Sequence, residues 1–345
     1  MAFDKELMGL FEKEFKDDMK ISRVSEDLRG KVIVLYGSNN VGKTLQASRF
    51  KNPIFLPCEK GMNAINGAMV LKTNSWNDLK RNGRKLTSKK FVNALKQGME
   101  MTVVIDGMER IGNYVKSYLC DKYEVATIGK ANGGYGAWEE YENLVWSWVD
   151  SLIGVGYTVV FIGHEKEDKK KDKFVITGDE RTIKPIRDNA DVVCYIRSNG
   201  VDKDGVEIHS SAYLAETEDF FARSRYRYMD TYIEDFTAEN LTKVIIEGIR
   251  KQNEEEGYEN VSFEKQQDIY SVKNETFEEV VEQIKTLYEK CLDSDLEQDY
   301  ADIVEEHLGE VAVSEATKKQ LEPLKCIRDD LKDLLIDNDI EIEEN

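Results

Sequence analysis

Short apolar runs alternate with helical patterns through the body of this chain. The runs cover residues 31–36, 54–57, 102–105, 158–162 and 192–196, and a hairpin-like stretch follows near 206–222. Brief, uninterrupted apolar runs are typical of strands that are buried on both faces. Their alternation with helical segments predicts βαβ units, a mostly parallel sheet and therefore an α/β fold.

The two ends of the chain show helical periodicity instead. Residues 1–30 place Leu7, Leu10, Phe11 and Phe15 at helical spacing, which predicts an N-terminal helical segment. Residues 252–257 (Gln-Asn-Glu-Glu-Glu-Gly) indicate a linker, and helical patterns resume from residue 275 towards an acidic tip that we expect to be disordered. We therefore expect a helical segment over 1–30, a core over 31–250 and an acidic helical C-terminal region over 251–345.

The composition fits a globular protein of about two domains, with 345 residues of which 41% are apolar. No apolar run reaches the ~18 residues of a membrane span, and the N-terminus has no signal-peptide core, so we expect a cytoplasmic protein without a membrane partner. The five cysteines form no C-x-x-C pair and are interpreted as reduced thiols. The three histidines stand in no cluster of cysteines or carboxylates at ligand spacing, which argues against a zinc site.

The net charge of −19 is confined to one part of the chain. Residues 251–345 hold 10 Lys+Arg and 29 Asp+Glu, whereas residues 1–250 hold 38 of each. The neutral body is thus compatible with a polyanionic partner. One hypothesis is that the acidic region mimics phosphate charge and occupies a DNA channel; the alternative is a helical appendage that charge keeps apart.

One short segment indicates the ligand. It has the spacing G-x-x-x-x-G-K-[ST] and consists of Gly37, Ser38, Asn39, Asn40, Val41, Gly42, Lys43 and Thr44. In this phosphate loop, backbone N–H groups surround phosphate oxygens, Lys43 reaches the β- and γ-phosphates and the Thr44 hydroxyl can ligate Mg²⁺. A predicted strand before the loop and a predicted helix over 44–50 after it supply the required context.

Three polar residues follow other predicted strands. Asp106 ends the apolar run 101–105, and on a neighbouring strand it would hold Mg²⁺ with Thr44; the alternative is a strand-capping aspartate before a glycine. Glu59 follows the strand at 54–57, at the sheet edge where ligands bind, and could activate water as a general base or be a solvated loop residue. His164 follows the strand at 158–163 and could contact the γ-phosphate and sense its loss, or be a satisfied strand-end side chain.

Two segments are predicted to be mobile loops that contact nucleic acid. Residues 126–137 are rich in glycine and contain Lys130 and Tyr135, and Tyr135 could stack on a base. Residues 165–182 contain a basic cluster, which is an electrostatic signature of nucleic-acid binding. Its members are Lys166, Lys169, Lys170, Lys171, Lys173 and Arg181. The alternative is a solvated hairpin tip, because four nearby acidic residues offset part of this charge.

Arginines alternate at Arg223, Arg225 and Arg227, so a strand would place all three on one face. Arg223 and Arg225 could then reach the phosphates bound by a neighbouring subunit, because the planar guanidinium suits phosphate. The alternative is an ordinary exposed basic edge.

Taken together, these residues resemble the RecA-like P-loop ATPases, and among them the small phage-encoded AAA-family type, which resembles a trimmed RecA core. The resemblance covers roughly residues 30–250. The more particular matches are Glu59 in Cys-Glu-Lys-Gly, His164 in Phe-Ile-Gly-His and the pair Arg223 and Arg225 in Ala-Arg-Ser-Arg. Histidine stands where RecA itself more usually has glutamine, and no separate duplex-binding domain is apparent.

The resemblance implies an ATP- and Mg²⁺-dependent ATPase, with catalytic roles for Lys43, Glu59, His164, Arg223 and Arg225. It implies a homo-oligomer, ring or filament, that binds single-stranded DNA through the segments around Lys130, Tyr135 and Lys169–Lys173 and promotes annealing or homologous recombination in a host cytoplasm. A single-strand-binding or replication protein would dock on the C-terminal region. Two alternatives are a helicase-type motor or helicase-loading ATPase, and a nucleotide-gated interaction protein that acts through its acidic region.

Overall fold

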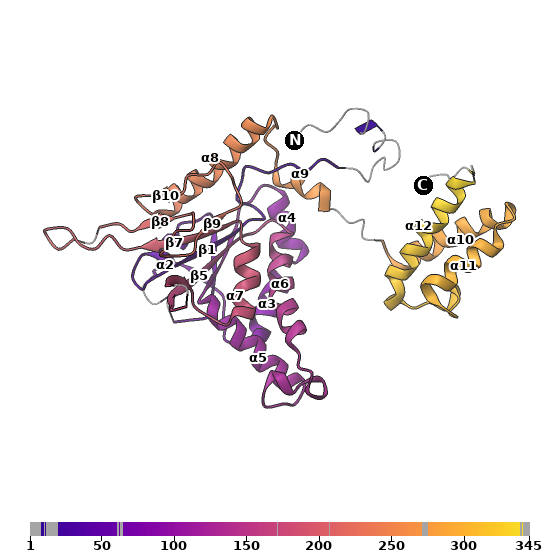
Figure 1. The fold of residues 1–345 in the computed structure, drawn as a ribbon, viewed down its shortest axis with the longest axis horizontal. Helices are drawn as coiled ribbons and strands as arrows, with labels where there is room; N and C mark the ends of the chain where they lie inside the picture. Colours follow the sequence, from indigo (N-terminus) through magenta and orange to yellow (C-terminus); the bar gives the residue numbers. More distant parts are fainter. Residues whose placement is uncertain are drawn as a thin grey trace. The chain divides into compact units, whose positions relative to one another are not determined.

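A computed structural model of the chain describes residues 8, 9, 11, 20–60, 62, 65–170, 172–206, 208–270, 275–338 and 340 (Figure 1). The chain divides into two compact units, Met1–Tyr270 and Ser271–Asn345. Each unit is described by itself below.

The first unit is built on a mixed sheet of ten strands with the order β10-β8-β7-β1-β5-β4-β2-β3, while β6 pairs with β5 and β9 pairs with β7. The strands are β1 (Val32–Gly37), β2 (Pro53–Pro57), β3 (Met69–Val70), β4 (Thr102–Asp106), β5 (Thr158–Asp168), β6 (Lys173–Ile176), β7 (Val192–Arg197), β8 (Ser211–Tyr213), β9 (Arg223–Ser224) and β10 (Tyr232–Ile233). The predicted runs correspond to β1, β2, β4, β5 and β7, and these five strands pair with one another in parallel. The prediction of an α/β fold with a mostly parallel sheet is thus confirmed.

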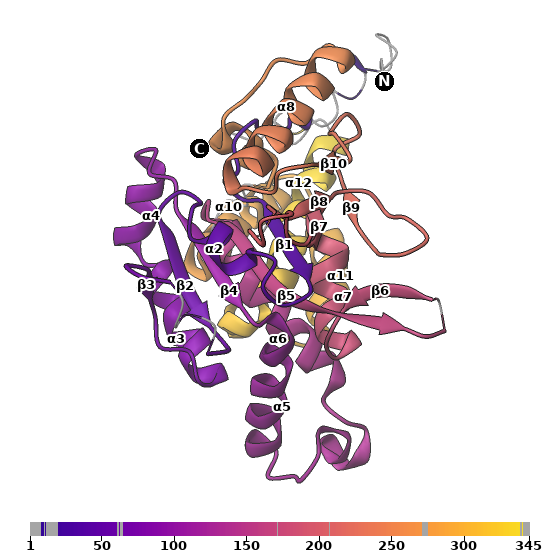
Figure 2. The same ribbon diagram turned by 90° about the vertical axis from the view of Figure 1, so that its left-hand side faces the viewer.

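Helices cover both faces of this sheet (Figures 1 and 2). They are α2 (Lys43–Ala47), α3 (Trp76–Leu86), α4 (Lys89–Lys96), α5 (Ile111–Lys122), α6 (Trp138–Ile153), α7 (Glu180–Asn189), α8 (Ala238–Glu256) and α9 (Phe263–Gln267). Alternate residues of β1 enter different cores: Val32 and Val34 pack with α3, α5, α6 and α7, whereas Ile33 and Leu35 pack with α2 and α8. This period of two explains why β1 is apolar throughout.

Several local expectations were wrong. The helix after the phosphate loop ends at Ala47, well before residue 50. Residues 165–182 are not an irregular loop, because β5 continues to Asp168 and pairs antiparallel with β6. Among the described residues near 206–222, only β8 is a strand, and its antiparallel partners are β7 and β10.

The ends of the first unit also differ from expectation. Among the described residues of the N-terminal segment, 20–30 are not helical, and Ser25 forms a β-bridge with Val261. The unit extends to Tyr270 and not to residue 250. The physical reason is burial: Asn253 is 3% exposed and Phe263 is 6% exposed, with its ring against Gly30.

The second unit is a small helical bundle, as its periodicity predicted. Its helices are α10 (Phe277–Asp293), α11 (Glu297–Leu308) and α12 (Leu321–Asp337). They share a core that includes Ile284, Leu287, Leu324 and Leu331. The predicted disordered tip lies largely outside the described residues.

Two further expectations concern membrane-spanning helices and the redox state of the cysteines. None of the described helices has the length and apolar character needed to cross a membrane. All five cysteines are free thiols, as the absence of a C-x-x-C pair indicated.

Candidate nucleotide site

The phosphate loop has the backbone that its sequence requires. A side chain on Gly37 would place Cβ 2.1 Å from the carbonyl oxygen of Ile196, so only glycine fits beside β7. Asn40 and Gly42 adopt positive φ angles of 62° and 82°, a region that glycine and asparagine tolerate best. These residues turn the chain tightly between β1 and α2, which is the form that aims successive N–H groups at an anion.

Lys43 lies inside this loop. Its side chain is buried, and its ammonium donates hydrogen bonds to the carbonyl oxygens of Gly37, at 3.0 Å, and of Ser38. Burial lowers the pKa of Lys43, and the nearby carboxylates of Glu165 and Asp106 oppose that effect. A cation held within a loop of N–H donors fits the triphosphate of a nucleotide.

Thr44 and Asp106 meet as predicted for a Mg²⁺ site. The Thr44 hydroxyl donates to Asp106 Oδ2 at 3.2 Å, and burial raises the pKa of Asp106. One detail of the prediction was wrong: β4, which ends at Asp106, is not beside β1, because β5 lies between them. A hydroxyl and a carboxylate are hard oxygen ligands of the kind Mg²⁺ takes, so the residues present fit the ion.

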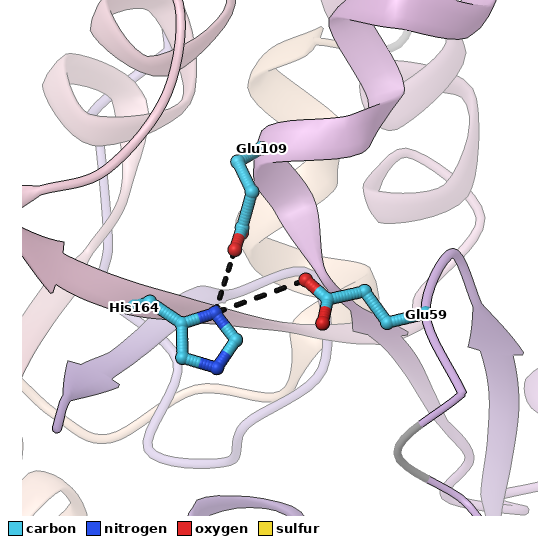
Figure 3. Close-up of side chains that lie close together, drawn as sticks. All are labelled: Glu59, Glu109 and His164. Carbon is cyan, nitrogen blue, oxygen red and sulfur yellow. Dashed lines mark hydrogen bonds and ion pairs between the residues drawn. The ribbon is translucent and has the colours of Figure 1, made fainter. Parts of the chain in front are cut away.

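Glu59 and His164 lie together at the same edge of the sheet, and Glu109 joins them (Figure 3). His164 pairs in register with Gly37, the first residue of the phosphate loop. Its Nδ1 lies 2.6 Å from Glu109 Oε1 and 3.7 Å from Glu59 Oε1. Three segments that are far apart in sequence therefore converge beside the loop.

The charges of this cluster affect one another. Burial and the neighbouring Glu109 raise the pKa of Glu59. The hydrogen bond to Glu109 raises the pKa of His164, although burial acts against it. Burial alone would raise the pKa of Glu109, but the hydrogen bond from His164 lowers it overall. The hydrogen bond thus favours the charged forms of both His164 and Glu109, and Glu59 is the more basic of the two carboxylates.

Glu109 was missed by sequence reasoning. It lies in the short 3₁₀ helix Met108–Arg110 that follows β4. The available signal was its position three residues after Asp106, one turn beyond the edge where ligands bind. Histidine spacing also did not reveal that Glu59, Glu109 and His164 bring one ligand atom each within 4.8 Å of the others. The expectation that the chain has no zinc site stays a prediction.

Arg223 and Arg225 do not reach this site in their own subunit. Both donate to the carbonyl oxygen of Asp188, at 3.1 and 3.3 Å. Arg223 pairs with Val193, which lies beside Val34, three residues before Gly37. That places Arg223 roughly 10 Å short of the loop along the strand and two strands away across the sheet. The expected alternation in one strand holds only in part, because β9 ends at Ser224.

The predicted DNA-binding residues lie on two separate segments of the first unit. Tyr135 is 93% exposed and Lys130 is exposed in a pair of 3₁₀ turns that precede α6. Lys169 and Lys170 are exposed at the tip of the hairpin formed by β5 and β6, whereas Lys173 is paired with Glu216 at 2.7 Å. Lys171 lies outside the described residues. Arg181, in α7, stacks on Trp138, the first residue of α6, with 4.1 Å between the guanidinium carbon and the ring centroid.

The fold and the loop define a P-loop NTPase with an α/β core. Residues 29–226 match the family described as "AAA domain". The chain is 45% identical over 318 residues to the "SPbeta prophage-derived uncharacterized protein YorG" of Bacillus subtilis (strain 168), and the match spans 92% of this chain and 97% of that protein. The chain belongs to the AAA domain family.

The comparison with solved structures is less informative than the family and sequence matches. A prototypical ATPase from the type III secretion system of pathogenic bacteria aligns over 91% of this chain and 88% of its own length. The sequence identity is 9% and the TM-score is 0.34, which is too low to bear on the fold.

Proposed function

We propose that this P-loop NTPase hydrolyses ATP as a homo-oligomer on single-stranded DNA and promotes annealing or homologous recombination. One observation carries the proposal: β5 presents His164 beside Gly37 of the phosphate loop and then continues directly into the basic hairpin. A single strand thus connects the nucleotide site to a surface suited to phosphate.

The nucleotide would be held by groups already in place. Lys43 and the loop N–H groups would bind the β- and γ-phosphates, and Thr44 and Asp106 would hold Mg²⁺. When bound, the ion supplies charge neutralisation at the phosphoryl group. The fit rests on the backbone of Gly37 and on the 3.2 Å contact between Thr44 and Asp106.

Glu59 would act as the general base. Its pKa, raised by burial and by the neighbouring Glu109, makes it a better proton acceptor than an exposed glutamate. His164 would donate to the γ-phosphate from the ring nitrogen that Glu109 leaves free. Loss of that phosphate would remove the contact and alter the position of β5 beyond His164.

The DNA contact would use exposed groups of residues 126–137 and 165–182. Lys130, Lys169, Lys170 and Arg181 would bind backbone phosphates, and Tyr135 would stack on a base. The hairpin is anchored below its tip, since the Tyr195 hydroxyl donates to Glu165 Oε2 at 2.8 Å. A movement at His164 would therefore pass to the hairpin through a short, structured strand.

The position of Arg223 and Arg225 supports the proposed oligomer. Because neither reaches its own phosphate loop, a role at the nucleotide requires the loop of another copy. Head-to-tail packing would place these arginines on that copy's phosphates and complete the site between subunits.

The proposal is tested by annealing of complementary single strands with ATP and Mg²⁺, with Lys43→Ala as the control. We expect ATP-dependent annealing that Lys43→Ala loses. Unwinding of a tailed duplex without annealing would favour a helicase-type motor. Activity that requires an added helicase would favour a loading ATPase.

A second candidate function has its own structural support. The bundle α10–α12 has a separate core, and residues 271–345 carry 8 basic and 23 acidic groups. Such a unit suits a nucleotide-gated interaction protein that docks a basic partner. Truncation after Tyr270 separates the two: retained annealing favours DNA action by the first unit, whereas loss of partner capture with annealing absent throughout favours docking.

A further inference from the structure

All three histidines of the chain lie beside carboxylates, but only one of them has two. His209 lies 2.7 Å from Asp235, and His307 lies 2.6 Å from Asp330. His164 contacts both Glu109 and Glu59. In the part of the chain that the structure describes, this is the one group of three such side chains within reach of a single ion.

We propose that Glu59, Glu109 and His164 form a binding site for a first-row transition metal ion such as Zn²⁺, separate from the Mg²⁺ position at Thr44 and Asp106. One imidazole and two carboxylates are a set that such ions accept at about 2.0–2.2 Å, with water completing the shell. The imidazole discriminates against Mg²⁺, which prefers oxygen ligands.

The geometry is close to what an ion needs. Ligand atoms about 2.1 Å from one metal lie roughly 3.0–3.5 Å apart in octahedral or tetrahedral arrangements. The observed separations from His164 Nδ1, 2.6 and 3.7 Å, lie on either side of this range. Figure 3 shows both carboxylates directed at this nitrogen, and the three ligand atoms lie within 4.8 Å of one another, so a local rearrangement of the side chains would admit the ion.

A second observation points to a missing partner. Glu109 Oε2 is buried and accepts no hydrogen bond among the described residues. A buried carboxylate oxygen without a partner costs free energy, and a bound cation on the same carboxylate offsets that cost. The nearest cationic competitor, Arg110, lies 3.9 Å from Glu59 Oε1 with a side chain that is 57% exposed, so it can move into solvent.

Occupancy would arrest hydrolysis, and this consequence rests on the proposed roles of Glu59 and His164. A metal-bound Glu59 cannot accept a proton from water, and a metal-bound His164 is fixed in place. The site would thus let a transition metal ion switch the ATPase off without displacing the nucleotide.

The site itself is tested by titrating full-length, nucleotide-free protein with Zn²⁺ and with Co²⁺ in millimolar Mg²⁺. We expect one ion per chain, binding at least tenfold weaker in Glu109→Gln and His164→Gln, and unchanged binding in the matched control His209→Gln. Thermal melts would verify that each variant folds. The Co²⁺ spectrum should lack a thiolate charge-transfer band.

Equal affinity in all variants, or a thiolate band, would overturn the site. The arrest of hydrolysis is tested separately from the metal site. Stoichiometric Zn²⁺ should abolish ATP turnover by the wild type, and a chelator should restore this turnover. Bound Zn²⁺ with undiminished turnover would overturn the arrest alone. A protein that never hydrolyses ATP would refute the proposed function, and the titration would still decide the metal site.

Discussion

At the scale of single residues, Glu59 owes its position to the residue behind it. Gly107 has a φ of +86°, and a Cβ there would lie 2.3 Å from Glu59 Cγ. The glycine thus serves both a left-handed turn and the close approach of the proposed base. Gly98 has the same φ of +86° but nothing within 4 Å of a built Cβ.

This pair gives a controlled prediction. Gly98→Ala should cost only the backbone strain of about 1–2 kcal/mol. Gly107→Ala should cost roughly 1–3 kcal/mol more through overpacking and should lower ATP turnover at least tenfold by displacing Glu59. Denaturant unfolding and steady-state ATPase assays measure the two effects. Equal turnover in both variants would show that the position of Glu59 does not matter.

The pair of Glu109 and His164 predicts a pH dependence. The folded-state pKa of His164 is raised, so its stabilising effect is present below the unfolded value of ~6.5 and is lost as the pH rises through the folded value. Glu109, whose pKa is lowered, remains ionised down to below ~4.3. The pair therefore stabilises the fold between these limits.

Glu109→Gln should accordingly destabilise the protein most near pH 6, by on the order of 1 kcal/mol, since His164 is 35% exposed and solvent screens the pair. This loss of folding stability in Glu109→Gln should become smaller as the pH rises towards 9. Chemical denaturation of wild type and variant across this range tests it. A loss that grows with pH would contradict a protonated His164.

Local spacing predicted the phosphate loop because all its functional groups lie within eight residues. Glu59 and Asp106 were predictable as strand-end residues, whereas His164, expected to follow its strand, lies within β5. Glu109 was not predictable, because its role depends on a side-chain contact with His164, 55 residues away, that no local pattern encodes.

At the scale of elements, the proposed coupling of the nucleotide site to the basic hairpin depends on β5. It lies between β1 and β4, presents His164 at the loop and extends into the hairpin. The sequence predicted the strand but neither its place in the sheet nor its length. Strand order is set by packing between distant segments, and the charged residues 165–168 conceal the continuation because they carry no apolar signal.

The hairpin tip gives an element-scale prediction. Lys169→Ala with Lys170→Ala should weaken single-stranded DNA binding and lower the slope of log affinity against log salt by about 1.4, the value for two lost phosphate contacts. Lys89→Ala with Lys90→Ala, an exposed pair at the start of α4, is the matched control. Fluorescence anisotropy at several salt concentrations measures both. An unchanged slope in the hairpin variant would remove the hairpin from the DNA interface.

At the scale of the whole molecule, the proposed role of Arg223 and Arg225 would complete the nucleotide site only between two copies of the chain. Arg223 and Arg225 lie at the amino-terminal end of β7, whereas the loop lies at the carboxyl end of β1. The alternation of arginines in the sequence indicated a shared face, but only the sheet register shows that this face is remote from its own loop.

This separation predicts complementation. The double change Arg223→Ala with Arg225→Ala should abolish ATP hydrolysis and leave nucleotide binding intact, while Arg227→Ala should retain activity. Mixing the double variant with Lys43→Ala should restore part of the turnover, because some interfaces then combine an intact loop with intact arginines. Turnover that survives in the double variant alone would exclude the trans role.

In the proposed function, β5 couples the binding of single-stranded DNA to the hydrolysis of ATP. The most direct measurement is the rate of ATP hydrolysis with and without single-stranded DNA, with duplex DNA as comparison and Lys43→Ala as control. We expect single-stranded DNA to stimulate ATP hydrolysis markedly, duplex DNA to stimulate it less, and Lys43→Ala to show no stimulation. Hydrolysis that is indifferent to DNA would contradict this coupling and would direct attention to a protein partner of the second unit.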